Sequence, residues 1–340
     1  MKKHLIAAAV VSAFAAPAMA QNVTVYGVLD VGYNYTDTDV TGGNSSVVDN
    51  SLVTSRIGLR GSEDLGGGLK ADFQIEGTFH PSYGELGTNT ADTNGTKLFD
   101  REAWVGVSGN FGAIRIGRSD ITDSQNIDAK VSQMGNLGLI AASNSNNAAK
   151  MVRYSTPTFN GFSAQVGYAS PNNSTTSAGV VENTEGSVQS IYLSYEAGPL
   201  GIYLGQDELK VNATTDQTQN TFGVKYDFGV ASVGLVYGSK DNVLTSSATA
   251  YTRGANGKDL DMTVLSVAVP LANGFKLHGA YEKQDLDGSV DQADFKAYTF
   301  AVTKSLSKRT SAYAAFVSTD KDLSTQNDAK AYTVGVTHSF

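Results

Sequence analysis

Apolar and polar residues alternate along most of the chain, and the last ten residues show this most clearly. In the segment 331–340, Tyr332, Val334, Val336, His338 and Phe340 occupy every second position, with small or hydroxylated residues between them. A period of two places these two sets on opposite faces of a strand. The same pattern recurs at 23–35, 162–168 and 222–228. Because the apolar face persists from strand to strand and carries Tyr and Phe near strand ends, it predicts an all-β chain whose apolar face contacts lipid.

The connections between the predicted strands fall into two classes. Seven are short and rich in turn-forming residues, at 65–68, 109–112, 156–161, 197–199, 228–230, 271–274 and 306–309. Eight are long and polar, at 37–50, 81–96, 119–147, 171–186, 211–219, 239–259, 285–294 and 319–328. This asymmetry predicts about sixteen antiparallel strands in a transmembrane barrel, with short periplasmic turns, long outer loops and a water-filled interior.

The N-terminal segment has the features of a secretory signal peptide. Two lysines precede an apolar run at 5–14, and a small-residue cleavage site ends at Ala20. We therefore expect residues 1–20 to be removed and residues 21–340 to form the barrel domain. No run reaches the roughly 20 apolar residues of a spanning helix. Since a closed barrel is the other structure that satisfies the backbone in a bilayer, the expected location is the outer membrane.

Composition narrows the chemistry further. The chain has no cysteine, which excludes disulfides and thiolate metal sites. Without the two lysines of the signal, 23 basic side chains face 33 acidic ones, a net charge of −10 that argues against nucleic acid as a partner. The remaining histidines, His80, His278 and His338, lie far apart in the strand order and lack a nucleophile partner. We therefore predict neither an enzyme nor a cofactor.

The third long connection, 119–147, has a composition that favours an inward fold. It is the longest of the eight and contains the apolar patch 137–140. Packing inside the barrel wall would cover this patch, whereas a surface loop would expose it to water. Its carboxylates Asp120, Asp123 and Asp128 would then lie along one side of the pore. A solvated surface loop is the alternative.

Basic residues are expected on the opposite wall. Arg56 and Arg60 alternate with apolar residues that face lipid, so both point into the lumen, where they avoid a cost of about 2 to 4 kcal/mol each. Arg101 shares its parity with lipid-facing residues and reaches the lumen only through a bulge or above the apolar band. The predicted basic residues of the constriction are Arg56, Arg60, Arg101, Arg115 and Arg153, and the predicted acidic ones are Glu76, Asp120, Asp123 and Asp128. The alternative for each arginine is a structural role, in which it forms an ion pair with Asp30 or Glu76 and has no effect on flux.

Several motifs resemble those of the general porins of beta-proteobacteria, the neisserial and Burkholderiales type. They lie at 25–30, 55–71, 108–112, 116–118, 152–157, 306–310 and the terminal Phe340, so that the resemblance spans the chain after the signal. It implies a trimeric 16-stranded barrel whose third outer loop narrows the pore. It also implies that the barrel-assembly machinery recognises Phe340.

The resemblance extends to individual positions of the constriction. Arg56 and Arg101 match two of the family's constriction arginines, and Glu76 matches an acidic residue facing them. Asn147 occupies a position that often carries a third arginine, which weakens the basic side.

These observations predict an outer-membrane porin that passes ions and small hydrophilic solutes by passive diffusion, with a mild anion preference. The expected partners are outer-membrane lipid, two further copies of the chain in a homotrimer, the assembly machinery, and the solutes. Two alternatives stay open. One is a sugar- or organic-anion-selective channel, whose aromatic lining would include Tyr26, Tyr192 and Tyr203. The other is an adhesin or receptor barrel with a plugged lumen.

Overall fold

The computed structural model of the protein describes most of the predicted barrel. The described residues are 23–39, 42–87, 97–120, 123–137, 147–175, 181–210, 216–243, 258–286, 295–321 and 328–340. The predicted signal peptide, residues 1–20, lies outside them. In the described part of the chain, no helix has the length and apolar character needed to span a membrane.

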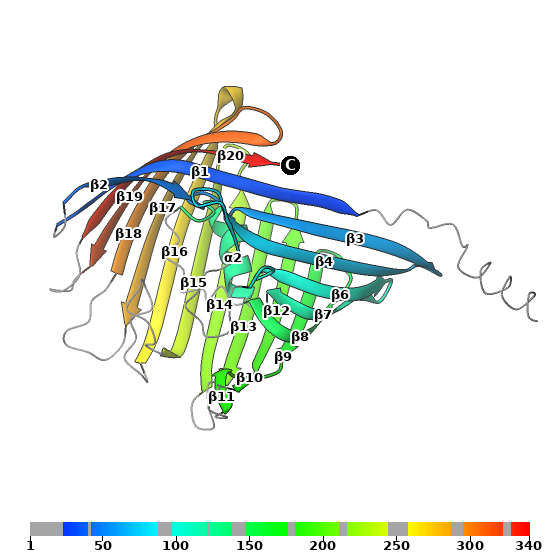
Figure 1. The fold of residues 1–340 in the computed structure, drawn as a ribbon. Helices are drawn as coiled ribbons and strands as arrows, with labels where there is room; N and C mark the ends of the chain where they lie inside the picture. Colours follow the sequence, from blue (N-terminus) through cyan, green and yellow to red (C-terminus); the bar gives the residue numbers. More distant parts are fainter. Residues whose placement is uncertain are drawn as a thin grey trace, which may run out of the picture.

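Sixteen antiparallel strands form a closed ring in the described residues, as the alternation predicted (Figure 1). The wall strands are β1 (Thr24–Thr38), β3 (Arg56–Gly66), β4 (Leu69–His80), β6 (Glu102–Gly109), β7 (Gly112–Asp120), β8 (Asn147–Ser155), β9 (Phe162–Ala169), β12 (Val188–Ala197), β13 (Leu200–Lys210), β14 (Asp216–Asp227), β15 (Ser232–Val243), β16 (Lys258–Pro270), β17 (Phe275–Leu286), β18 (Phe295–Ser305), β19 (Thr310–Lys321) and β20 (Ala329–Ser339). Each pairs with the next around the wall, and β1 pairs with β20 to close the ring.

Closure brings the two ends of the barrel sequence together. The backbone N–H of Phe340 donates to Gly27 at 3.1 Å, and the N–H of Gly27 donates back at 3.2 Å. Both residues lie at the end of the barrel that carries the short connections, which we call the turn end; the opposite end is the loop end. A closed ring leaves no unpaired strand edge, which is the condition for a sheet in a bilayer.

The two faces of the wall have the chemistry that strand parity predicted. On β20, Val334 and Val336 are exposed on the outside, whereas Thr333 points inward and donates to Asn34 at 2.8 Å. On β7, Ile114 and Ile116 are exposed while Arg115 between them is half-buried. Outward apolar residues therefore form the lipid-facing surface.

The seven predicted short turns connect consecutive wall strands as expected. At 66–68 three successive glycines have φ values of +82°, +61° and +81°, which only glycine adopts without strain. The 3-10 turn η1 (Ala272–Gly274) joins β16 and β17. Short strands also lie in the outer connections, namely β2 (Asn44–Asp49), β5 (Glu85–Leu86), β10 (Asn172–Thr175) and β11 (Val181–Glu185).

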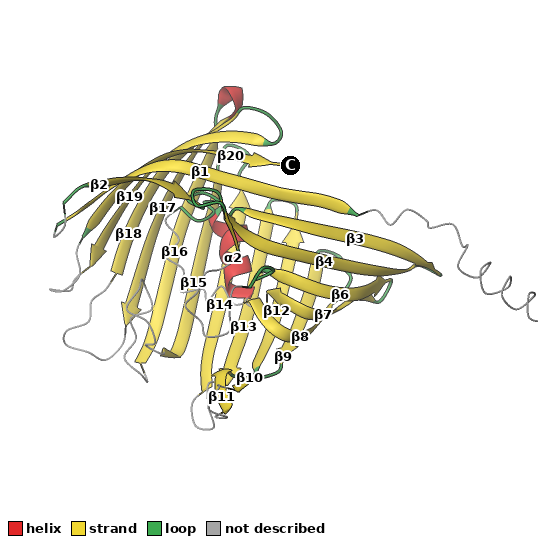
Figure 2. Ribbon diagram, viewed as in Figure 1, coloured by secondary structure: helices red, strands yellow, loops and turns green. Residues whose placement is uncertain are grey.

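One helix, α2 (Asp123–Ser132), lies inside the ring of strands and belongs to the third long connection (Figure 2). Its residues Ile127 and Val131 are buried, at 0% and 1% exposure, and pack against lumenal residues of β12, β13, β15 and β16. Gly223 and Gly234 make room for them. A Cβ at Gly223 would lie 2.9 Å from Val131 Cγ2, and one at Gly234 would lie 2.7 Å from Val131 Cγ1. The helix therefore fits into a shallow seat in the wall.

The chain that follows α2 is anchored on another part of the wall. Met134 and Leu137 are buried against Ala301, Tyr313 and Ala315 of β18 and β19. Leu137, the first residue of the predicted apolar patch, is therefore buried, and residues 138–140 lie outside the described residues.

The segment between β2 and β3 also contacts the residues that follow α2. The N–H of Asn136 donates to the carbonyl of Leu52 at 2.8 Å. The buried carboxylate of Asp30 in turn accepts the N–H of Leu52 at 2.5 Å and that of Val53 at 2.8 Å, and the hydroxyl of Tyr313 at 2.7 Å. Asp30 thus stabilises the segment 52–53, and it forms no ion pair with an arginine among the described residues, which was one of its predicted roles.

Candidate functional site

A single carboxylate, Glu76 on β4, organises one side of the lumen opposite α2. It is 6% exposed and accepts the hydroxyl of Tyr26 at 2.8 Å. Its Oε1 accepts a hydrogen bond from Arg101 Nε at 2.6 Å, and Arg56 Nε lies 3.8 Å from its Oε2. Two guanidinium groups therefore share the carboxylate of Glu76. The structure brings together Arg56, Arg101 and Glu76, three of the residues named for the constriction.

Arg101 reaches the lumen because it precedes the strand ladder of β6. Asp100 just before it is buried and accepts both the N–H and the hydroxyl of Thr78, at 2.7 and 2.8 Å. The N–H of Arg101 donates to the carbonyl of Glu76 at 3.2 Å. These bonds fix the turn before β6, so that the lipid-facing parity of the strand does not apply to Arg101.

The side chain of Tyr26 lies along the lumenal side of the wall beside this cluster. Its ring lies over Gly58 on the neighbouring strand, where a Cβ would be only 2.6 Å from the ring atom Cζ. Its hydroxyl donates to Glu76 and accepts an N–H of Gln74 at 2.8 Å. The absence of a side chain at Gly58 is therefore what allows the ring to connect β1 with β4.

Arg60 and Arg115 rest on aromatic rings. The guanidinium carbon of Arg60 lies 5.0 Å from the centroid of Tyr26, and that of Arg115 lies 4.2 Å from the centroid of Trp104. Neither forms a salt bridge with any residue that the structure describes. Stacking orients a guanidinium plane while leaving its N–H groups for other partners.

Arg153 and Asp120 form a close pair where the third long connection leaves the wall. Arg153 donates to the carboxylate of Asp120 at 2.8 Å, and its side chain is only 11% exposed. A cavity of about 310 Å³ separates this pair from α2, and its lining includes Glu102, Lys130 and Tyr192. Arg153 therefore has a partner already, and it holds the start of the loop.

Asp128 does not line the open path that was predicted for it. It lies on the buried side of α2, at 5% exposure, and its Oδ1 has no hydrogen-bond partner among the described residues. It follows Ile127 directly in the sequence, so the contact of Ile127 with the wall carries its neighbour into the interface. The carboxyl is desolvated, which raises the pKa of Asp128 to about 7.

We expect the docking of α2 to depend on pH through Asp128. A raised pKa means that docking stability is complete below about pH 4, where the free carboxyl is also protonated, and decreases as pH rises through about 7. Asp128→Asn should remove this decrease. It should therefore slow the hydrogen exchange of residues 123–132 at pH 8, because each unit by which the pKa is raised corresponds to about 1.4 kcal/mol of docking free energy lost at high pH. Equal exchange in wild type and variant at pH 8 would contradict this, and Glu63→Gln, an exposed acid near the turn end, is the control.

Two of the predicted constriction residues cannot be placed in the lumen. The side chains of Asp123 and Asn147 lie outside the described residues, so their roles stay predictions. Of the charged side chains that the structure describes on α2, the exposed one is Lys130, which pairs with Glu196 at 3.0 Å. The described face of α2 is therefore not the acidic wall that the sequence predicted.

Sequence reasoning missed the lumenal roles of Glu102, Trp104 and Lys130. Strand parity alone contained the signal for the first two, since both alternate with the outward-facing Ala103 and Val105. Lys130 carried no such signal, because its orientation depends on which face of α2 packs on the wall.

The aromatic lining expected of a sugar-selective channel does not form from the tyrosines predicted for it. Tyr192 and Tyr203 are 3% and 0% exposed because they pack in the cluster that seats α2. Tyr26 is held flat beneath Arg60. Among the described residues, no group of three His, Cys, Asp or Glu side chains is arranged to hold a metal ion.

Comparison with known families identifies this arrangement. The family model of the Gram-negative porins matches residues 7–340. The chain belongs to this family. Porins are channels of the outer membrane, so the closed barrel is a water-filled path for ions and small solutes, and the predicted family and location are confirmed.

Known relatives of this porin agree with the assignment. The outer membrane porin protein 32 of Delftia acidovorans is 32% identical over 348 residues, which cover 96% of this chain and 92% of that protein. An anion-selective porin from Comamonas acidovorans has a similar structure, with a TM-score of 0.76, 25% identity, and coverage of 94% of this chain and all of that one. A trimer form of OmpT from Vibrio cholerae shares the fold, with a TM-score of 0.65, 18% identity, and coverage of 94% of this chain and 100% of that one.

Proposed function

We propose that this porin passes small hydrophilic solutes passively with a preference for anions, and that the third long connection narrows its pore. The observation that carries the proposal is the pairing of charges on the wall. Arg56 and Arg101 share the single carboxylate of Glu76, while Arg60 and Arg115 rest on rings instead of carboxylates. Such a wall attracts anions and repels cations where the path is narrow. The similarity to an anion-selective porin supports the same sign.

We further propose that the porin is a homotrimer, that residues 1–20 are its signal peptide, and that Phe340 is read by the barrel-assembly machinery. A trimer form among structures of the same fold supports the first point. The exposure of Phe340 at the turn end supports the last, because this residue is 41% exposed there.

Reconstitution in a planar bilayer tests the proposed function. We expect stepwise conductance and a zero-current potential across a KCl gradient with the sign of an anion preference. A cation-favouring potential would keep the channel and transfer its selectivity to the carboxylates. Closed barrels without conductance would favour a plugged receptor or adhesin.

Neutralising Glu76 should strengthen the anion preference. Glu76→Gln keeps the size of the side chain but removes the charge that Arg56 and Arg101 share. One unit charge at about 6 Å in water is worth about 0.7 kcal/mol, so the local anion concentration should rise roughly threefold. The measurement is the zero-current potential. Glu85→Gln removes the same charge from an exposed position in β5 and should leave the potential unchanged; an equal shift in both variants would contradict the local role of Glu76.

A further inference from the structure

The turn between β18 and β19, residues 306–309, differs from the other short turns in its charge. The seven short turns have the sequences LGGG, GNFG, TPTFNG, AGP, FGV, LANG and LSKR, and only the last contains charged side chains. Both of these, Lys308 and Arg309, are basic and exposed. In a chain with more acidic than basic residues, this turn is a local positive charge that complements an anionic partner.

A third basic residue lies beside this turn on the outer face of the wall. Lys304 on β18 has the parity of Phe300, which is exposed on the lipid-facing side. Its Nζ lies 4.3 Å from the centroid of the Phe275 ring on the neighbouring strand β17. Phe275 is one of the exposed aromatic residues at strand ends, and such residues lie at the level of the lipid headgroups. The basic residues are therefore near the headgroups of the periplasmic leaflet.

The basic residues of this region are not neutralised by the protein. Neither Lys304 nor the two residues of the turn form a salt bridge with any residue that the structure describes. The backbone of the turn is nevertheless fixed, because the hydroxyl of Ser307 accepts the N–H groups of Arg309 and Thr310 at 3.1 and 3.0 Å. The turn thus presents its basic side chains to a partner from an ordered backbone.

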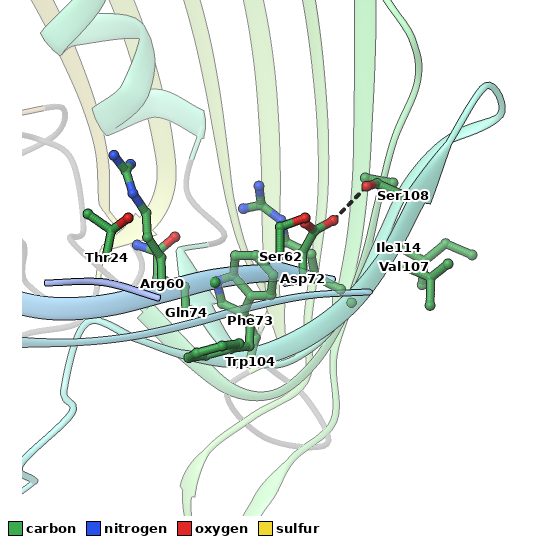
Figure 3. A pocket seen from close by; sticks show the side chains of 14 residues that line it. Thr24, Arg60, Ser62, Asp72, Phe73, Gln74, Trp104, Val107, Ser108 and Ile114 are labelled. Atoms are coloured by element: carbon green, nitrogen blue, oxygen red, sulfur yellow. Dashed lines mark hydrogen bonds between the residues drawn. The ribbon is translucent and has the colours of Figure 1, made fainter. Parts of the chain in front are cut away.

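The wall at β3 and β4 provides a contrast. Figure 3 shows Arg60 and Asp72 on its lumenal side, with Asp72 bonded to Ser108 along the dashed line. Val107 and Ile114 on the neighbouring strands are exposed on the other face. These charges near the turn end therefore serve the lumen, whereas Lys304 lies on the lipid-facing side.

We propose that Lys304, Lys308 and Arg309 form a binding site for an anionic phospholipid of the periplasmic leaflet. Ammonium and guanidinium groups are the donors that proteins use for phosphate, and the guanidinium can bind two of its oxygens at once. Basic pockets beside membrane-spanning segments bind anionic headgroups in the same way. The site is separate from the charges that carry the proposed selectivity, because it lies on the outside of the barrel.

The apolar part of this surface matches the acyl chains of such a lipid. Leu306 in the turn is exposed, and so are Leu277 and Phe300 on the outer faces of the adjacent strands β17 and β18. A soluble anion would neutralise the basic residues but leave these side chains uncovered. A phospholipid does both at once, which is why we assign the site to a lipid.

Native mass spectrometry of the full porin in detergent tests the site. Dioleoyl phosphatidylglycerol, which is anionic, is compared with dioleoyl phosphatidylethanolamine, which has the same chains and no net charge. We expect the anionic lipid to bind at least tenfold more tightly. Lys308→Gln with Arg309→Gln should lower its affinity at least tenfold, because each basic residue near an anionic headgroup strengthens binding roughly fivefold. Binding of the uncharged lipid should not change.

A matched control removes two lysines from the same two strands. Lys283 and Lys296 are opposite each other on β17 and β18, at the loop end of the barrel. Lys283→Gln with Lys296→Gln therefore changes the net charge by the same amount and leaves the turn intact. This variant should retain the preference for the anionic lipid.

Three outcomes would overturn the lipid site. Two are equal binding of both lipids by the wild type and a preference that persists in the Lys308 and Arg309 variant. The third is dissociation of that variant into monomers, which would assign the turn to a contact with a second copy, where the exposed Glu63 and Asp64 offer the complementary charge. Conductance is measured separately, so failure of the lipid site and failure of the proposed function are distinguishable.

Discussion

Replacement of Arg56 and Arg101 by alanine should strongly reduce the anion preference of the channel. The two guanidinium groups lie at 3.8 and 2.6 Å from the carboxylate of Glu76, so the variant removes two positive charges beside this carboxylate. Each unit charge at about 6 Å in water changes the local concentration of either ion roughly threefold, in opposite directions for anions and cations. Two charges therefore remove most of the anion preference of this part of the wall, while Arg60 and Arg115 remain. The measurement is the zero-current potential across a KCl gradient.

The matched control removes two basic charges at a distance from the cluster. Lys308 and Arg309 are exposed in the turn between β18 and β19. Their double alanine variant should keep the wild-type potential. If the Arg56 and Arg101 variant retains the wild-type potential, these two arginines are structural ties and do not govern the flux.

Release of α2 from its seat should have the second large effect. Ile127 and Val131 are almost completely buried against the wall, and burying such a side chain contributes about 1.5 to 3 kcal/mol. Ile127→Asn with Val131→Asn removes both contributions and adds two buried amides without partners. The helix should then leave the wall, which makes the single-channel current larger and noisier. Single-channel recordings at high salt, where each step is largest, measure both properties.

The control for this variant lies on the same helix. Ala129 is exposed on the opposite face, and Ala129→Asn introduces the same residue without touching the seat. Its conductance and noise should equal those of the wild type. An unchanged or smaller conductance in the Ile127 and Val131 variant would show that α2 keeps its place by its other anchor, at Met134 and Leu137.

Local alternation was sufficient to predict the barrel. A period of two assigns each side chain to the lipid or the lumen without knowledge of its neighbours, and lipid excludes charges from one face. The lumenal positions of Arg56, Arg60, Arg115 and Arg153 followed from this rule. The turns followed as well, because Gly and Asn accept the positive φ values and Pro fixes the negative φ that tight turns require.

The pairing of the charges could not be predicted in the same way. Tyr26 and Glu76 are fifty positions apart, and their contact depends on the register of three neighbouring strands. Arg101 broke the parity rule because Asp100 and Thr78 fix a turn before β6. Asp128 lies against the wall because Ile127 beside it fills a seat that Gly223 and Gly234 leave open.

The sequence by itself thus determined the class of protein, which face of each strand contacts lipid, and which charged side chains point into the lumen. Each of these depends on local periodicity and on the exclusion of charge from lipid. Only the tertiary structure decided which charges neutralise one another and which stay available to a solute. Arg153 is engaged by Asp120, whereas Arg60 and Arg115 are held by rings. The physical reason is that an ion pair needs its partners within a few ångströms, and that distance is set by strand register and helix packing across the barrel.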